Sequence, residues 1–431
     1  MDNPKIMWVS AQVLSIAKDD DLESQKSFFG GWTMAMLRRI ASYQIDLSVV
    51  FCAKVQQRRH EQIDGIEVFI LPIAGKDKAV SEQDRDWAVK SFLPDLIQIE
   101  GTEFRIQNLF SKLQTVPKLV SLQGILNGYK DYQYGLLQID EMLHSRKSIH
   151  ERIIARVLRA RKHRCFDNRL SMEIETMRNA NYFTGRTTWD RAYSYWINPH
   201  AEYYHCSRIL RDSFYHSQWQ YEECVQHSIY VSNGSSALKG LHIALEALRY
   251  LKKEYPDVKL FVAGLSPDLS PSIINPKSMG YPLLIRDMIK KFDLGDSVQF
   301  LGMIPEQDVA SILKKVNVYV LTSLIENSPN SLGEAMLLGT PCVAANVGGV
   351  CDMARYGEAL LYRANDPVML AWNVKQVFDS NDLARSLSEK ARAHARQTHD
   401  PASNVNSLLS AYASILNLSE IKARVMNETD E

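Results

Sequence analysis

Two glutamates stand eight residues apart in LTSLIENSPNSLGEAMLLGTPCVAANVGGV, residues 321–350. Glu326 lies in a polar run after an apolar segment, and Glu334 lies where a short helical pattern begins. A carboxylate pair of this kind could serve one active site as acid, base or hydroxyl ligand. Alternatively, Ser331-x-x-Glu334 fits a capping box, which satisfies backbone groups at a helix start without any function. The residues alone leave both interpretations open.

A lysine and a helix start could bind an anion near these glutamates. Lys239, in SNGSSALKG, begins an expected helix, where a cation is unfavourable for the helix dipole. A bound anion would explain that position, whereas a solvated lysine would need no ligand. The helix expected to begin at Asn330, Ser331 and Leu332 would offer unpaired N–H groups to phosphate oxygens.

The sequence has no G-x-G-x-x-G and no G-x-x-x-x-G-K-[ST] phosphate-binding motif. Gly30-Gly31 falls between the first expected strand and the first expected helix. Backbone without side chains could approach a ligand at that point, although a tight turn would explain the pair equally well.

Short apolar segments rich in Val and Ile alternate with segments of helical period throughout the chain. KIMWVS, IDLSVVFC, IEVFILP, DLIQIE and KLVSLQG are such segments in the first half, and SIYVS, VKLFVAG, VQFLG, VNVYVLTS and TPCVAA in the second. This alternation predicts α/β architecture with two largely parallel sheets covered on both faces. We expect two domains, 1–210 and 211–400.

The composition is typical of an ordinary globular protein. The chain has 431 residues, 45% hydrophobic and 23% charged, and its 50 basic side chains balance its 50 acidic ones. No global field therefore favours nucleic acid, and we expect no nucleic-acid partner. The six scattered cysteines and the absence of a recognisable signal peptide predict a cytoplasmic protein.

One segment is strongly basic. Residues 144–169 carry nine Lys or Arg against one Glu and one Asp, and apolar residues recur among them at helical spacing. A basic amphipathic helix over 146–164 could lie on an anionic membrane surface. A solvated helix that covers a sheet with its apolar stripe is the alternative.

Several segments resemble a known family. ENSPNSLGEAMLLGTPCVAANVGGV is similar to the E-x7-E region of the retaining family-4 glycosyltransferases, which have the GT-B fold. VQFLGMIPEQDVASILKKVNVYVLTS, KGLHIALEAL, VKLFVAG and GGW occur in that family's order. The strong likeness covers about residues 228–400, while TGRTTWDRAY and SLQGILNGY resemble a bacterial polysaccharide-assembly subgroup.

The resemblance implies two Rossmann-like domains that face each other across a cleft. The second would hold a UDP- or GDP-linked sugar, and the first would hold a glycan or lipid-linked acceptor. The C-terminal helix, about 401–418, would return to the first domain. A retaining, metal-independent sugar transfer needs no cofactor, and a lipid-linked acceptor would suit the inner face of the plasma membrane.

The resemblance also implies roles for individual residues. Glu334 would bind the ribose hydroxyls, and Glu326 would contact the donor sugar. Lys239 and the backbone of Asn330, Ser331 and Leu332 would hold the diphosphate.

Two glycine-containing turns complete the implied donor site. The backbone of Gly302, Met303 and Ile304 would meet the base. Gly30 and Gly31 would let the first domain approach the donor phosphates.

The sequence departs from the family pattern at several positions. Asn233-Gly234-Ser235 replaces the usual arginine, so a second diphosphate cation must come from elsewhere or be absent. Arg186 is one candidate, with a structural salt bridge as the alternative. Gln123 stands where many relatives carry histidine, so a histidine contact to the donor sugar is ruled out there, and we count Gln123 among the acceptor residues. Glu103, close to Glu100, could bind an acceptor hydroxyl or could cap the next helix.

Two other functions fit the same architecture: a nucleotide-sugar epimerase, and a catalytically silent protein that binds nucleotide-sugars. The missing arginine is the feature that favours the silent protein. The D-x-D strings near Asp19 and Asp84 lie far from the donor motifs, so we interpret them as turns or helix caps rather than metal ligands.

Overall fold

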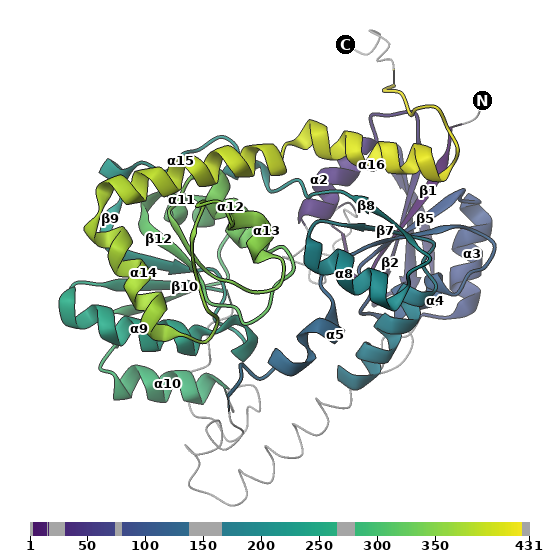
Figure 1. Cartoon of the computed structure of the whole chain (residues 1–431). Helices are drawn as coiled ribbons and strands as arrows, with labels where there is room; N and C mark the ends of the chain where they lie inside the picture. The colour runs from purple at the N-terminus through teal and green to yellow at the C-terminus, as the bar shows by residue number, and fades with distance from the viewer. Residues whose placement is uncertain are drawn as a thin grey trace, which may run out of the picture. The chain divides into compact units, whose positions relative to one another are not determined.

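The computed structural model describes residues 3–14, 16, 31–73, 80–137, 166–264 and 281–424. It forms two compact units, which Figure 1 shows by their separate sheets. Unit 1 comprises Met1–Asn127, Asp167–Leu210 and His399–Glu431, and unit 2 comprises Gly128–Phe166 and Arg211–Thr398. The sequence-based domains differ in placing residues 128–166 in the first domain; the basic segment 146–164 lies outside the described residues.

Unit 1 is built on an eight-stranded sheet of order β3-β4-β2-β1-β5-β6-β7-β8. All neighbours are parallel except the β3–β4 pair. The strands are β1 (Lys5–Ser10), β2 (Asp46–Ala53), β3 (Arg59–Ile63), β4 (Ile66–Pro72), β5 (Leu96–Glu100), β6 (Lys118–Ser121), β7 (Tyr182–Gly185) and β8 (Glu202–His205). Every residue of β5 is buried, as expected for a parallel strand covered on both faces.

Successive side chains of β1 enter two different apolar cores. Ile6 and Trp8 pack with residues of α2 and α16, whereas Met7 and Val9 pack with residues of α3 and α4. The described helices of this unit are α2 (Gly31–Ile40), α3 (Glu82–Phe92), α4 (Arg105–Ser111), helical residues 166–178, α8 (Thr188–Ile197) and α16 (Pro401–Ile415). The period of two along a strand therefore places helices on both faces of this sheet.

Unit 2 is built on a six-stranded sheet of order β11-β10-β9-β12-β13-β14, with every pair parallel. The strands are β9 (Val225–Val231), β10 (Lys259–Ala263), β11 (Val298–Gly302), β12 (Val316–Leu321), β13 (Cys342–Ala345) and β14 (Leu360–Tyr362). Counted along the chain, this is the doubly wound order 3-2-1-4-5-6. The structure thus confirms the predicted α/β class with two parallel sheets.

Helices cover the second sheet. They are α9 (Leu241–Glu254), α10 (Tyr281–Lys291), α11 (Glu306–Lys315), α12 (Asn330–Leu338), α13 (Val350–Ala354), α14 (Pro367–Asp379) and α15 (Asn381–Thr398). Short helical turns also occur: α5 (Leu126–Tyr129), η1 (Lys130–Tyr132), η2 (Asp212–Phe214), η3 (Tyr221–Glu223) and η4 (Ala237–Lys239). Gly339 ends α12 in the left-handed conformation, which glycine adopts without steric cost. No helix in the described part of the chain is long and apolar enough to cross a membrane.

A buried hydrogen-bond chain ties the last helix to the first sheet. Trp8 Nε1 donates to the Tyr412 hydroxyl at 2.9 Å, and that hydroxyl donates to Gln98 Oε1 at 2.5 Å. Gln98 Nε2 then donates to Glu100 Oε1 at 2.5 Å. All these groups are buried, so each needs a protein partner in place of water. The α16 helix therefore contributes a polar partner as well as apolar area to unit 1.

Tyr412→Phe should destabilise the protein, because Trp8 and Gln98 would each lose a buried partner. An unsatisfied buried group costs about 1–3 kcal/mol, so the free energy of unfolding should fall by about 2–4 kcal/mol. Urea unfolding followed by tryptophan fluorescence measures this. Tyr204→Phe is the matched control, because its hydroxyl bonds Ser414 on the same helix at an exposed position. Equal effects of the two substitutions would contradict the interpretation.

Candidate functional site

The two central strands of unit 2 mark the point where the strand order reverses. From β9 the chain proceeds to β10 on one side, and from β12 it proceeds to β13 on the other. Loops that leave neighbouring strands in opposite directions open a crevice at the carboxyl edge of such a sheet, where ligands bind. The loop after β9 leads to Lys239, and the loop after β12 leads to Glu326.

These two side chains form an ion pair in the structure. Lys239 Nζ donates to Glu326 Oε1, although 87 residues separate them in the chain. The Glu326 side chain is only 10% exposed and that of Lys239 is 30% exposed. The sequence suggested a bound anion as the partner of Lys239. In the structure the partner is the Glu326 carboxylate.

The backbone around Lys239 is fitted closely to the loop after β12. Thr322 Oγ1 donates to Lys239 O at 2.7 Å, and Leu324 N donates to Leu238 O at 2.9 Å. Gly240 has φ +70°, and a Cβ there would lie 2.1 Å from Thr322 O. A residue without a side chain is required at this point, between η4 and α9.

A second glycine turn holds the carbonyl of Glu326. Gly349 N donates to Glu326 O at 3.1 Å. Gly348 has φ +49°, and a Cβ there would lie 2.0 Å from Glu326 O. The Glu326 backbone is thus held by the turn before α13.

Glu334 faces a different cation. Arg211 Nε and Nη2 donate to Glu334 Oε1 and Oε2, each at 2.7 Å, in a bidentate pair. The Arg211 guanidinium also lies 4.9 Å from the centroid of the Phe214 ring. Burial raises the pKa of the Glu334 carboxyl, and the Arg211 charge opposes that rise. The geometry is that of an ion pair with both carboxylate oxygens bonded.

The predicted capping box at Ser331 is wrong. The helix α12 begins at Asn330 after Pro329, so Ser331 is its second residue and Glu334 its fifth. Ser331 Oγ instead accepts a hydrogen bond from the Tyr319 hydroxyl at 2.9 Å. Because Pro329 lacks a side-chain acceptor, the helix start has no side-chain cap.

The start of α12 leaves two backbone donors for a ligand. Leu332 N already donates to Pro329 O at 3.1 Å. Within the described residues, the N–H groups of Asn330 and Ser331 have no such partner. These two donors, rather than that of Leu332, could meet an anion at this helix end.

The other predicted donor-site residues lie at separate places. Gly302 ends β11 with φ +70° and open space around its Cβ position, and Met303 beside it is 41% exposed. Ile304 follows, half-buried, before α11. Gly31 is the first residue of α2 in unit 1, and Gly30 lies outside the described residues.

Arg186 is buried at the carboxyl edge of the first sheet. Its Nη2 donates to Gln123 O at 3.2 Å, and its backbone N donates to Asp190 Oδ2 at 2.9 Å. Burial lowers the pKa of Arg186, and the nearby Asp190 charge counters this shift. Arg186 and Gln123 are therefore in contact in unit 1, and Asp190 is the acidic residue beside the Arg186 charge.

Glu100 lies at the reversal point of the first sheet, between β1 and β5. Its Oε1 belongs to the chain that includes Tyr412, whereas its Oε2 is buried and has no hydrogen-bond partner among the described residues. Burial raises the pKa of Glu100, and the bond from Gln98 acts in the opposite direction.

Glu103 does not cap the next helix, contrary to one of the two interpretations offered for it. The cap position of α4 is Phe104, whose N–H donates to Gln107 Oε1 at 2.7 Å. Burial raises the pKa of Glu103 to about 6, the Arg169 charge lowers it, and Glu173 raises it. A raised pKa of this kind makes Glu103 a candidate acid–base group of a binding site.

Arg211 is the site residue that the sequence did not indicate. It lies in HCSRILRDSF, which we interpreted only as a domain boundary. Its partner is 123 residues away, so no local pattern could have revealed the pair.

The comparisons with known proteins match mainly the part of the chain that carries Lys239, Glu326 and Glu334. The family described as glycosyl transferases group 1 matches residues 222–394. D-inositol 3-phosphate glycosyltransferase of Corynebacterium urealyticum is 27% identical over 37% of this chain and 36% of its own length. The putative colanic acid biosynthesis glycosyltransferase WcaL of Salmonella typhimurium is 26% identical over 37% of this chain and 38% of its own.

A solved structure gives the fold of the whole chain. HepE of Anabaena, in complex with UDP-glucose, matches 95% of this chain and 99% of its own, with a TM-score of 0.64 and 15% identity. This likeness confirms the GT-B fold. The chain spans less than half the length of the curated relatives that it matches.

Gly348→Ala should disturb the Glu326 loop. A left-handed φ costs a residue with a Cβ about 1–2 kcal/mol, and the added methyl would also collide with the Glu326 carbonyl. We expect the free energy of unfolding to fall by at least about 2 kcal/mol, measured by thermal or urea unfolding.

Gly295→Ala is the control for this experiment. A Cβ at Gly295 would meet nothing within 4 Å, and its φ is not left-handed. The alanine should be neutral or slightly stabilising. A Gly348→Ala protein as stable as Gly295→Ala would show that the turn does not constrain Glu326.

Proposed function

Because residues 222–394 match the family described as glycosyl transferases group 1, we propose that this protein transfers a sugar from a nucleotide-sugar to an acceptor. The transfer retains the anomeric configuration and requires no metal and no cofactor. The observation that carries the proposal is the Lys239–Glu326 ion pair at the reversal point of the second sheet.

Cleavage of the anomeric C–O bond leaves positive charge on the sugar and negative charge on the diphosphate. Lys239 and the N–H groups of Asn330 and Ser331 are donors that could stabilise the departing diphosphate. Donors oriented in advance are effective, because they need no reorganisation during the reaction. The sugar would lie against Glu326, whose carboxylate favours the developing positive charge.

The diphosphate would compete with Glu326 for the same ammonium group. In the structure Lys239 is paired with Glu326, and both side chains are partly buried. Once the donor binds, Lys239 would bridge the diphosphate, and Glu326 would gain freedom to contact the sugar. The ion pair keeps two partly buried charges neutralised until the substrate arrives.

Glu334 would bind the two ribose hydroxyls of the donor. Each carboxylate oxygen accepts one bond from Arg211 and has a further acceptor site left. Arg211 would act as a positioning residue that fixes the plane of this carboxylate. The turn over Gly302, Met303 and Ile304 would meet the base.

Uridine is the base that a similar structure favours, because HepE was solved with UDP-glucose. A glycan or lipid-linked acceptor in polysaccharide assembly is supported by the likeness to WcaL. Such an acceptor would bind unit 1 near Glu103, Gln123 and Arg186. An enzyme that extends a lipid-linked acceptor would act in the cytoplasm, at the inner face of the plasma membrane.

The function is tested first with Glu326→Gln, which keeps the shape of the side chain and removes its charge. Release of nucleotide from UDP-, GDP- and ADP-sugars should fall about a hundredfold or more, while binding of UDP, read as a thermal shift, should persist. Glu358→Gln is the control, because Glu358 is a buried acid of unit 2 that pairs with His394 instead.

Wild-type activity in the Glu326→Gln protein would contradict the catalytic role. A wild-type protein that binds nucleotide-sugars but never turns them over would favour the silent binding protein. If Glu358→Gln also lost turnover, the loss in both variants would reflect destabilisation of the protein rather than a catalytic role of Glu326.

Arg211→Lys tests the positioning role by keeping the charge and losing the bidentate geometry. We expect the affinity for UDP to fall roughly tenfold, because the Glu334 carboxylate would lose its fixed orientation. Isothermal titration calorimetry measures the affinity. Arg286→Lys is the control, since Arg286 pairs with its neighbour Asp287 and not with Glu334. If Arg211→Lys lowers the melting temperature with UDP affinity unchanged, Arg211 is merely structural.

A further inference from the structure

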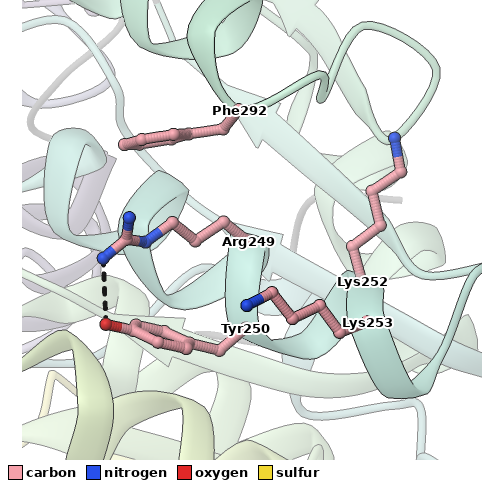
Figure 2. A pocket seen from close by; sticks show the side chains of 5 residues that line it. All are labelled: Arg249, Tyr250, Lys252, Lys253 and Phe292. Atoms are coloured by element: carbon pink, nitrogen blue, oxygen red, sulfur yellow. Dashed lines mark hydrogen bonds between the residues drawn. The ribbon is translucent and has the colours of Figure 1, made fainter.

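A basic hollow of about 420 Å³ lies on the surface of unit 2, away from Lys239 and Glu326. Arg249, Tyr250, Lys252, Lys253 and Phe292 line it, as Figure 2 shows. The first four come from the second half of α9, and Phe292 follows α10. Among the residues that the structure describes, the lining thus combines three cations with two aromatic rings and no acidic side chain.

Arg249 is held between the two rings. Its guanidinium carbon lies 4.7 Å from the centroid of Tyr250 and 5.0 Å from that of Phe292 (Figure 2). Arg249 Nη2 donates to the Tyr250 hydroxyl at 2.9 Å. Rings on two sides restrict the guanidinium, so little entropy is lost when it binds a ligand.

One donor of this guanidinium is left without a partner. Arg249 Nε is buried and has no hydrogen-bond acceptor among the described residues. A buried unsatisfied donor is costly in a native protein, and a bound ligand is one explanation for it. The unpaired Nε is therefore a second feature of Arg249, distinct from the charge of the hollow, that a ligand bound to the guanidinium would help to explain.

The acidic groups nearby neutralise only part of the positive charge. Lys252 Nζ donates to the backbone oxygen of Asp293 and lies 3.2 Å from its carboxylate. Over the ranges that the structure describes, no carboxylate forms an ion pair with Arg249 or Lys253. The hollow therefore carries an excess of positive charge.

An ordinary helix end explains only some of these features. Lysines in a last turn complement the helix dipole, and α11 carries Lys314 and Lys315 in the same position. That effect accounts for Lys252 and Lys253. It does not account for a guanidinium held between two rings beside a hollow.

We propose that this hollow binds a phosphate ester carried by an organic group. A guanidinium matches phosphate oxygens in pairs, and lysines add point charges around them. A volume of about 420 Å³ lies in the range of small-molecule sites, about 300–1,000 Å³, and exceeds the need of a single anion. The ester comes from a soluble molecule or from the headgroup of an anionic phospholipid.

This site is separate from the proposed donor site and does not rest on the proposed function. Arg249 lies eight residues into α9 beyond Leu241, about 12 Å along the helix at 1.5 Å per residue. The basic hollow is thus near one end of α9, whereas Lys239 precedes the other end.

Two probes test the proposal on the full-length protein. Glycerol 1-phosphate binding is measured by isothermal titration calorimetry, and membrane binding by co-sedimentation with phosphatidylcholine vesicles containing phosphatidylglycerol, against pure phosphatidylcholine. The double variant Arg249→Gln/Lys253→Gln should weaken binding. Near an anionic membrane each cation contributes roughly fivefold, so the double variant should partition roughly 25-fold less.

Lys314→Gln/Lys315→Gln is the matched control, because it removes two last-turn lysines elsewhere on unit 2. Circular dichroism checks that both double variants are folded, and Lys239→Gln shows whether glycerol 1-phosphate binds the proposed donor site instead. If the protein binds glycerol 1-phosphate but not the anionic vesicles, and only Arg249→Gln/Lys253→Gln loses this binding, the ligand is a soluble ester. Binding of anionic vesicles alone, lost in the same way, identifies a lipid headgroup.

Three results would overturn the proposal. The first is that neither probe binds the wild-type protein. The second is that Arg249→Gln/Lys253→Gln binds as the wild type does. The third is that Lys314→Gln/Lys315→Gln loses as much binding as Arg249→Gln/Lys253→Gln. The last result would show nonspecific attraction to surface lysines rather than a site.

Discussion

The geometry of the proposed donor site depends on keeping one partly buried carboxylate paired. Glu326 is nearly inaccessible to water, and its charge would be costly there without the Lys239 ammonium. That pair brings together the loops after β9 and β12, and Gly240 and Gly348 permit the close backbone contacts around it. Any anion that recruits Lys239 must replace the carboxylate as its partner, so the requirement for pairing would favour anionic ligands at the proposed site.

Much of the architecture could be predicted from local patterns. Val- and Ile-rich segments and helical periods indicated two parallel sheets because strand period and burial leave their mark within a few residues. Lys239 and Glu326 were both named from sequence, the former because a cation at a helix start is unfavourable. Their direct contact was not foreseen, since it depends on strand order, which no local pattern specifies.

Other errors and omissions have the same physical origin. The capping box at Ser331 failed because Pro329 sets the start of α12 earlier than the side-chain pattern suggested. The Arg211–Glu334 pair joins distant parts of the chain, and the segment around Arg211 has no motif. Glu103 was named from the sequence as an acceptor residue or a helix cap, but its raised pKa depends on burial and on charges from Arg169 and Glu173, which no local pattern reveals.

The bond between Trp8 and Tyr412 also has a consequence for biosynthesis. Its two partners are 404 residues apart, so at about 5–20 residues per second roughly 20–80 seconds separate their synthesis. The strands of the second sheet and the helices α9 to α15 lie between 211 and 398, so they are complete before α16 emerges. Unit 1 starts first on the ribosome yet finishes last, and its central strands must wait, without their final covering helix, until the whole second unit has been made.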